Sequence, residues 1–177
     1  MPTTASISTK HLTSQSNSIE RGSLLLRALS TTASWSSTVA RLVLAGVMFP
    51  HGAQKLLGWF GGYGFAGTLG FLTGKAGLPT PLAASVILIE FGAPLLLLLG
   101  LGTRFAALGI GAIMIGAIAT VHASNGFFMN WSGAQAGEGF EYHLLALGLV
   151  AVLLVQGGGL LSLDRLLASR SARTHSA

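Results

Sequence analysis

Glu90 is the most chemically unusual residue of the chain, because it is a carboxylate within an apolar segment. Residues 81–101, PLAASVILIEFGAPLLLLLGL, carry no other charge, and a run of about 20 apolar residues can cross a bilayer. A charge inside such a helix costs roughly 2.5–3.5 kcal/mol on insertion scales, so it often indicates a functional site. Glu90 is therefore a candidate for proton handling or ligand binding. The structural alternative is an ion pair with Arg41, Lys55 or a histidine that fixes the register of the helices.

Other ionisable residues fall near the same end of the apolar segments as Glu90. His51 precedes Lys55 by one helical turn, His122 ends the third apolar segment, and His143 lies near the start of the fourth. His51 joins Glu90 as a candidate for proton handling. The candidates for binding are Lys55, Trp59, Phe60, His122, Glu141 and His143. The alternatives are ordinary ones: histidines at helix ends often lie at the membrane interface, and Glu138 with Glu141 suits a solvated helix start.

Metal binding has weaker support. Three histidines could bind a metal or haem, but His51, His122 and His143 lie in separate apolar segments, and no two share a helix face. The chain has no cysteine, which excludes disulfides, thiolate metal sites and redox chemistry by its own thiols. We expect no metal ligands and no haem, and a quinone is the cofactor that these residues suit.

The composition indicates an integral membrane protein. Hydrophobic residues make up 51% of the 177-residue chain and charged residues only 8%, whereas charged residues make up about 25% of a soluble domain. The expected fold is an all-α, integral membrane four-helix bundle. The size of the chain suits one such bundle and leaves no room for a second domain.

Four apolar segments and two polar ends divide the chain. Residues 1–35 are rich in Ser and Thr and are expected to be disordered, apart from a short surface helix or plain linker at 19–29. Residues 36–160 form the membrane domain, with spans at about 37–57, 81–101, 104–122 and 141–156. A short amphipathic helix or re-entrant segment is expected after the first span, where glycines and aromatic residues are frequent. Residues 161–177 form a basic tail.

The distribution of positive charge predicts the orientation. With four spans, eight of the ten Lys and Arg residues fall on the side of the termini, and two, Lys55 and Lys75, fall on the other side. The eight are Lys10, Arg21, Arg27, Arg41, Arg104, Arg165, Arg170 and Arg173. The positive-inside rule then places both termini in the cytoplasm. Arg41 and Lys55, roughly 21 Å apart along one helix, would extend toward opposite interfaces. This topology explains the net charge without a nucleic-acid partner.

Four motifs in order carry a family resemblance. They come after Arg41 in the chain. They are HGAQKL at 51–56, EFGAPLLLLLGLGTR at 90–104, GEGFEYH at 137–143 and GGGLLSLDR at 157–165. Over about residues 38–167 the chain resembles the DoxX family of small four-span bacterial membrane proteins. Some relatives resemble the membrane subunit of a thiosulfate:quinone oxidoreductase, and others are described as partners of redox-defence enzymes or as quinol oxidase subunits. Lys55, Glu90, Arg104 and Glu141 fall on the family pattern, which supplies no agreed catalytic residue.

The resemblance and the residues together suggest the membrane subunit of a quinone-linked oxidoreductase or redox-defence complex in the bacterial inner membrane. Glu90 and His51, flanked by Trp59 and Phe60, would exchange protons with a quinone head group. Lys55 would hold an anionic form of the ligand, and His122, Glu141 and His143 would offer a proton route. One alternative is a non-catalytic scaffold that recruits a soluble redox enzyme. A proton-coupled transporter is another, and it would need a second copy of the chain because no inverted repeat is present. Expected partners are the lipid bilayer, a soluble or membrane redox enzyme and further copies of the chain.

Overall fold

The computed structural model describes residues 31–174, and within this range the fold is all-α. The helices are α2 (Trp35–Leu57), α3 (Gly64–Gly74), α4 (Thr80–Leu99), α5 (Thr103–Ala117), α6 (Glu141–Gln156) and α7 (Leu163–Thr174). Three short helical segments lie between them: η1 (Trp59–Gly61) follows α2, and η2 (Ile118–His122) and η3 (Ala123–Asn125) follow α5. The helix expected at 19–29 lies outside the described residues, as do Lys10, Arg21 and Arg27.

The chain is a helical membrane protein. Two helical stretches, Thr80–Leu99 and Thr103–Asn125, are long and apolar enough to cross a membrane, and α6 is apolar but shorter. Large apolar side chains, such as Leu88, Leu108 and Leu145, point outward and are exposed. An apolar outer surface of this kind suits lipid, which removes the need to bury leucines inside the protein. The helices α2, α4, α5 and α6 occupy the four segments in which spans were predicted.

Local sequence explains where the main helices begin and end. The side chain of Ser34 accepts a hydrogen bond from the backbone N–H of Ser37 at 3.5 Å and caps the start of α2. Gly58, which follows the last residue of α2, has φ 74°, a value that favours glycine. Pro81 lies in the first turn of α4, where its missing N–H costs nothing, and Gly100 ends this helix with φ 65°.

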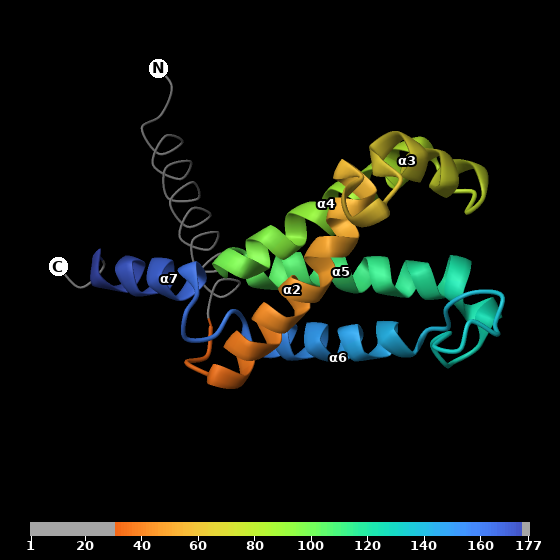
Figure 1. The fold of residues 1–177 in the computed structure, drawn as a ribbon. Helices are drawn as coiled ribbons and strands as arrows, with labels where there is room; N and C mark the ends of the chain where they lie inside the picture. Colours follow the sequence, from red (N-terminus) through yellow and green to blue (C-terminus); the bar gives the residue numbers. More distant parts are fainter. Residues whose placement is uncertain (1–30, 175–177) are drawn as a thin grey trace, which may run out of the picture.

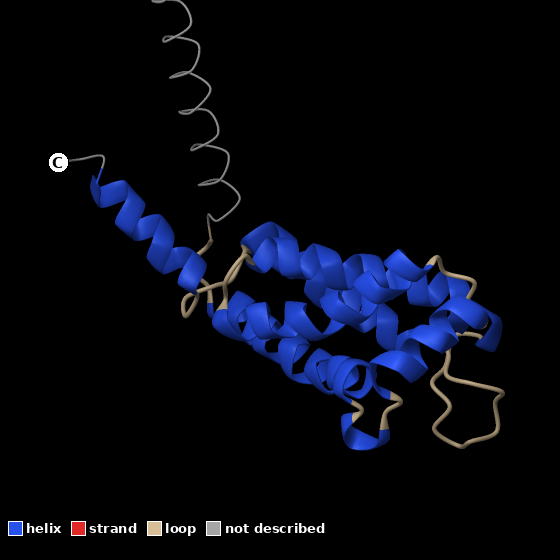
Figure 2. Ribbon diagram, turned by 90° about the horizontal axis from the view of Figure 1, so that it is seen from above, coloured by secondary structure: helices blue, strands red, loops and turns tan. Residues whose placement is uncertain are grey.

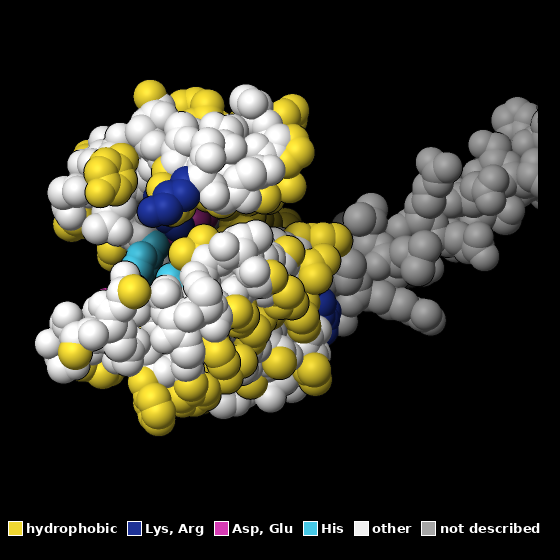
Figure 3. All heavy atoms as spheres, turned by 90° about the vertical axis from the view of Figure 1, so that its right-hand side faces the viewer, with side chains coloured by type: hydrophobic (Ala, Val, Ile, Leu, Met, Phe, Trp, Pro, Cys, Tyr) yellow, Lys and Arg dark blue, Asp and Glu magenta, His cyan; other side chains and the backbone are white. Residues whose placement is uncertain are grey.

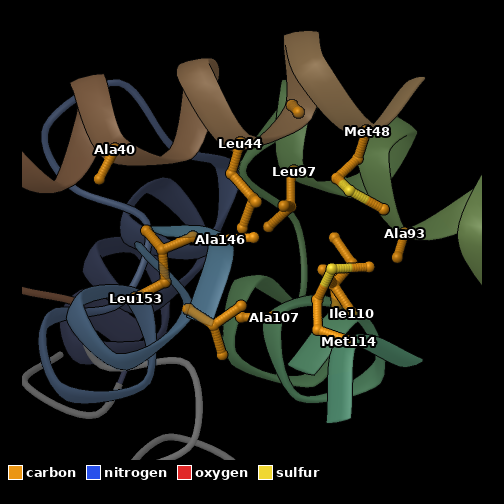
Figure 4. Packing of buried hydrophobic residues seen from close by; sticks show 13 residues of the cluster. Ala40, Leu44, Met48, Ala93, Leu97, Ala107, Ile110, Met114, Ala146 and Leu153 are labelled. Carbon is orange, nitrogen blue, oxygen red and sulfur yellow. The ribbon is translucent and has the colours of Figure 1, made fainter. Parts of the chain in front are cut away.

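The helices form a crossed bundle (Figure 1). The helix α2 lies obliquely across the others and packs mainly on α4, while α5 packs on both α4 and α6. Figure 4 shows the core where these helices meet, which includes Leu44, Met48, Leu97, Ile110 and Leu153. The short helix α3 follows α2 at one end of the bundle, with Thr68 buried and Phe65 and Phe71 exposed. At the opposite end, α7 extends away from the bundle (Figure 2).

A glycine brings α2 and α4 close together beside Glu90. A Cβ atom on Gly52 would lie only 2.6 Å from the Cα of Phe91, closer than real side chains approach. Gly52 therefore lets the two backbones touch at the level of the carboxylate. This contact places His51 and Lys55, which neighbour Gly52 on α2, next to the middle of α4.

Two arginines bind backbone carbonyls at the end of the bundle opposite α3. The Arg41 side chain is 1% exposed. It donates hydrogen bonds to the carbonyls of Leu97, Leu98, Gly158 and Leu161. We predicted that it would extend to the interface, which is wrong, because backbone carbonyls at the end of α4 and after α6 bind it inside the protein. Arg104 likewise donates to the carbonyls of Leu154 and Val155, at 2.8 and 3.0 Å.

Candidate functional site

A pocket of about 180 Å³ opens between the helices at the end that carries α3. Figure 3 looks into this end and shows Lys or Arg, His and acidic side chains together in a hollow between its upper and lower parts. The residues that line the pocket come from α2, α4, α5, η2, α6 and the loop before α6. They are Met48, His51, Lys55, Glu90, Ile113, Met114, Ala117, His122, Met129, Glu138, Tyr142 and His143.

The polar centre of the pocket is an ion pair between α2 and α4. The ammonium of Lys55 binds the Oε1 atom of Glu90. The Glu90 side chain is 2% exposed and that of Lys55 is 37% exposed, so the lysine has access to solvent and the carboxylate does not. The second carboxylate oxygen, Oε2, is buried and has no hydrogen-bond partner within the described residues. Of the three partners considered for Glu90, the structure therefore selects Lys55, and one oxygen is left without a protein donor.

Tyr142 extends the site toward His51. Its hydroxyl donates to the sulfur of Met48 at 3.3 Å, and its ring centroid lies 5.9 Å from that of His51. Tyr142 was not predicted as a site residue, although it stands between two predicted site residues in the motif GEGFEYH. One signal in the sequence could have identified it. Tyr142 directly follows Glu141, so the two side chains lie on different faces of α6, and when Glu141 faces the loop Tyr142 can face the pocket.

His122 and His143 meet at the α5–α6 side of the pocket. Their ring centroids are 4.2 Å apart, and the Nδ1 atom of His122 lies 2.8 Å from the carbonyl oxygen of Glu138. The His143 side chain is 7% exposed, and its Nδ1 atom lacks a partner among residues 31–174. The segment η2 that ends at His122 is a π-helix, Ile118–His122, and such segments often occur at functional sites.

Three predicted site residues lie outside the pocket lining. Trp59 and Phe60, in η1, are 52% and 65% exposed, and their rings pack edge to face against each other. Glu141 accepts a hydrogen bond from the backbone N–H of Met129 at 3.3 Å, so it holds the loop to the start of α6. Glu138 lines the pocket instead. Sequence position placed all four residues at the correct end of the bundle, but it does not determine which of them face inward.

The arrangement of the described residues limits the kinds of metal that could bind. Within residues 31–174, no group of three or more His, Asp and Glu side chains is placed to hold a metal ion. The lining combines the Lys55–Glu90 ion pair, a second carboxylate, three imidazoles of which two are in contact, a phenol and an apolar wall. Such a site can donate and accept protons around a small apolar ligand.

The comparisons with known proteins identify the family. The model of the DoxX family matches residues 36–123, about half of the chain. This segment contains Arg41, His51, Lys55, Glu90 and His122, so it includes the ion pair and one of the two neighbouring histidines. No curated protein and no solved structure matches the chain. The protein belongs to the DoxX family.

Proposed function

We propose that this protein is the membrane subunit of a quinone-linked oxidoreductase and that its pocket binds the quinone head group. The observation that carries the proposal is the ion pair between the buried carboxylate of Glu90 and the partly exposed Lys55, which lines an apolar pocket of about 180 Å³. An apolar cavity of about 150 Å³ accommodates a benzene ring, so one substituted ring fits here. Pockets for drug-sized ligands are larger, about 300–1,000 Å³.

The side chains suit the chemistry of a quinone. Reduction to the quinol consumes two electrons and two protons, and each carbonyl oxygen becomes a hydroxyl. Lys55 can donate a hydrogen bond to a quinone oxygen and stabilise negative charge on it. The free Oε2 atom of Glu90 can accept a hydrogen bond from a quinol hydroxyl, and His51 is close enough to the opening to exchange protons with water. Ile113, Met114 and Ala117 supply an apolar wall.

The electrons must come from a partner. The chain has no cysteine, so its thiols cannot carry electrons, and we propose a flavin- or metal-containing redox enzyme as the donor. Protons would pass between the pocket and the outer surface by way of His143 and His122, whose rings are 4.2 Å apart. We further propose that the protein crosses a bacterial inner membrane four times with both termini in the cytoplasm, because four spans would assign most Lys and Arg residues of the sequence to that side.

The ion pair also supports a second candidate, a non-catalytic scaffold. Lys55 and Glu90 join α2 to α4, and such a pair can fix helix register without any ligand. In that case the bundle would recruit a soluble redox enzyme, and the pocket would have no substrate. The two candidates predict different effects when Glu90 loses its charge. The quinone site predicts a loss of quinone binding and turnover, and the scaffold predicts a loss of assembled complex.

Quinone binding to the purified protein tests the proposal. In lipid nanodiscs, we expect titration with short-chain ubiquinone and menaquinone analogues to saturate at one site. Glu90→Gln and Lys55→Met should each weaken binding at least tenfold, since a hydrogen bond to a charged group contributes about 1.5–3 kcal/mol. Lys75→Met is the matched control, because Lys75 is exposed on the segment after α3 and does not line the pocket.

Electron transfer in native membranes provides the second measurement. Glu90→Gln should slow quinone reduction while the amount of assembled complex stays the same. If the purified protein binds no quinone and Glu90→Gln leaves electron transfer unchanged, the proposal is wrong. A loss of assembled complex in proportion to the loss of turnover, with no quinone binding, would identify the scaffold.

A further inference from the structure

We propose that the mouth of the pocket also binds a soft monovalent metal ion of the copper(I) class, held by His122, His143 and the thioether of Met129. This site goes beyond the proposed quinone function and does not depend on it, although a bound ion would occupy the two histidines of the proposed proton route. The first observation is the distribution of two residue types. Every methionine within residues 31–174 (Met48, Met114 and Met129) and every histidine (His51, His122 and His143) lines this one pocket.

The hydrogen bond of His122 sets the tautomer that a metal ligand needs. Its Nδ1 atom lies 2.8 Å from the carbonyl oxygen of Glu138. A carbonyl oxygen only accepts, so Nδ1 carries the proton and the lone pair lies on Nε2. Metal-binding histidines characteristically donate the other ring N–H to a backbone carbonyl or carboxylate in this way. The hydrogen bond from His122 to the loop thus fixes the tautomer that a metal requires.

His143 supplies the second nitrogen. The side chain is 7% exposed, and its Nδ1 atom is buried with no partner in the described part of the chain. A buried polar atom without a partner destabilises the fold unless a ligand binds it. Its ring centroid lies 4.2 Å from that of His122, so the two imidazoles, which come from α6 and η2, are in contact at the pocket. The histidine spacing within single helices predicted no metal site, whereas this pair lies across two helical segments.

Met129 is the third residue of the proposed site and carries a thioether. The backbone N–H of Met129 is bound at 3.3 Å by Glu141, two residues before His143, and Met129 lines the pocket with both histidines. Thioethers favour copper(I) over harder ions. A site for harder metals would need a third His, Asp or Glu, and the described residues do not group in that way.

The charges of the pocket tolerate one added positive charge. The one lysine of the pocket lining, Lys55, is bound by Glu90. Glu138 contributes a second carboxylate to the lining, and its Oε2 atom accepts from the backbone N–H of Asn130 at 2.6 Å. The lining therefore carries two carboxylates and one ammonium. A monovalent cation balances these charges, whereas a divalent one would exceed them.

Anaerobic titration with copper(I) tests the site. The full chain, carrying a tag without histidine, would compete for copper(I) with bicinchoninate, and we expect one tightly bound ion per chain. His143→Leu and Met129→Leu should each weaken binding at least tenfold. Trp131→Leu is the control, because Trp131 is an exposed residue of the same loop outside the pocket lining.

X-ray absorption at the copper edge of the wild-type protein gives a readout that needs no variant. We expect both nitrogen and sulfur neighbours. Absence of tight binding, nitrogen neighbours alone, or equal affinity in a correctly folded Met129→Leu variant would each overturn the proposal. Copper and quinone are titrated separately, so failure of one is distinguishable from failure of the other.

Discussion

At the scale of the residue, Arg41 is expected to be the side chain on which stability depends most. It is almost fully buried and donates to four backbone carbonyls. Arg41→Met would remove this donor from all four carbonyls, although the Leu97 carbonyl would keep the N–H of Gly100. Each buried group left unpaired costs about 1–3 kcal/mol, so we expect a loss of about 3 kcal/mol or more in the free energy of unfolding. Arg41→Lys should recover only part of it, because lysine lacks the planar fork of arginine.

Thermal unfolding of the purified protein in detergent would measure these losses. Arg170→Met is the matched control, since Arg170 is exposed on α7 and its removal should change stability by less than about 0.5 kcal/mol. An Arg41→Lys variant as stable as the wild type would show that a point charge suffices at this position.

The sequence indicated the important side chains better than it indicated their surroundings. Glu90 stood out as a lone charge in an apolar segment, and it is indeed buried in the site. Its partner could not be chosen among Arg41, Lys55 and histidine, because helix rotation decides which side chain faces it. Tyr142 was missed for a related reason: a tyrosine near a helix start is common, and only the packing of α6 on α2 turns its hydroxyl toward Met48.

At the scale of the element, the crossing of α2 and α4 depends on Gly52. Gly52→Ala would place a Cβ 2.6 Å from the Cα of Phe91, so the helices must move apart. We expect this variant to lose about 1–3 kcal/mol of stability, as overpacked cores do, and to weaken quinone binding because Lys55 and Glu90 shift relative to each other.

Gly46→Ala is the control for Gly52→Ala in the same helix. Gly46 is exposed, and a Cβ there meets nothing within 4 Å. Alanine favours the helix over glycine by about 0.8–1.0 kcal/mol, so this variant should be as stable as the wild type or more stable. Chemical unfolding of both variants would compare them, and equal stability of the two would contradict a close contact at Gly52.

Helices were easier to predict than their irregular parts. Long apolar runs bounded by glycine and proline indicated α4 and α5 directly, and the short helix after α2 followed from the glycine-rich segment. The π-helix Ile118–His122 gave no such signal, since its residues are as apolar as those of the helix before it. The helix α7 lies in a segment read only as a basic tail, although buried Asp164 anchors it by accepting from the backbone N–H groups of Gly102 and Thr103.

At the scale of the whole molecule, the orientation in the membrane can be tested because the chain contains no cysteine. Single cysteines can be introduced at Ser132, in the loop before α6, and at Ser169, in α7, both of which are exposed. In intact spheroplasts, a membrane-impermeant maleimide should label Ser132→Cys and leave Ser169→Cys unlabelled until the membrane is opened. The cysteine-free parent is the control. The reverse pattern would invert the proposed topology.

Folding brings together pocket residues that lie far apart in the sequence. The pocket draws on residues from Met48 to His143, and its two close pairs, Lys55 with Glu90 and His122 with His143, each join different helices. Composition and hydropathy predicted a membrane bundle with ionisable groups near one end. The pairing itself depends on crossing angles and side-chain rotation, which have no local signature in the sequence.

The π-helix before His122 has a consequence for comparing members of the family. A π turn holds one residue more than an α turn between hydrogen-bonded groups. A relative without that residue would continue α5 as a regular helix, and every later side chain would turn by about 100° about the axis. Another residue would then replace His122 at the pocket. A single insertion or deletion at 118–122 could therefore exchange one ligand for another while the bundle stays the same.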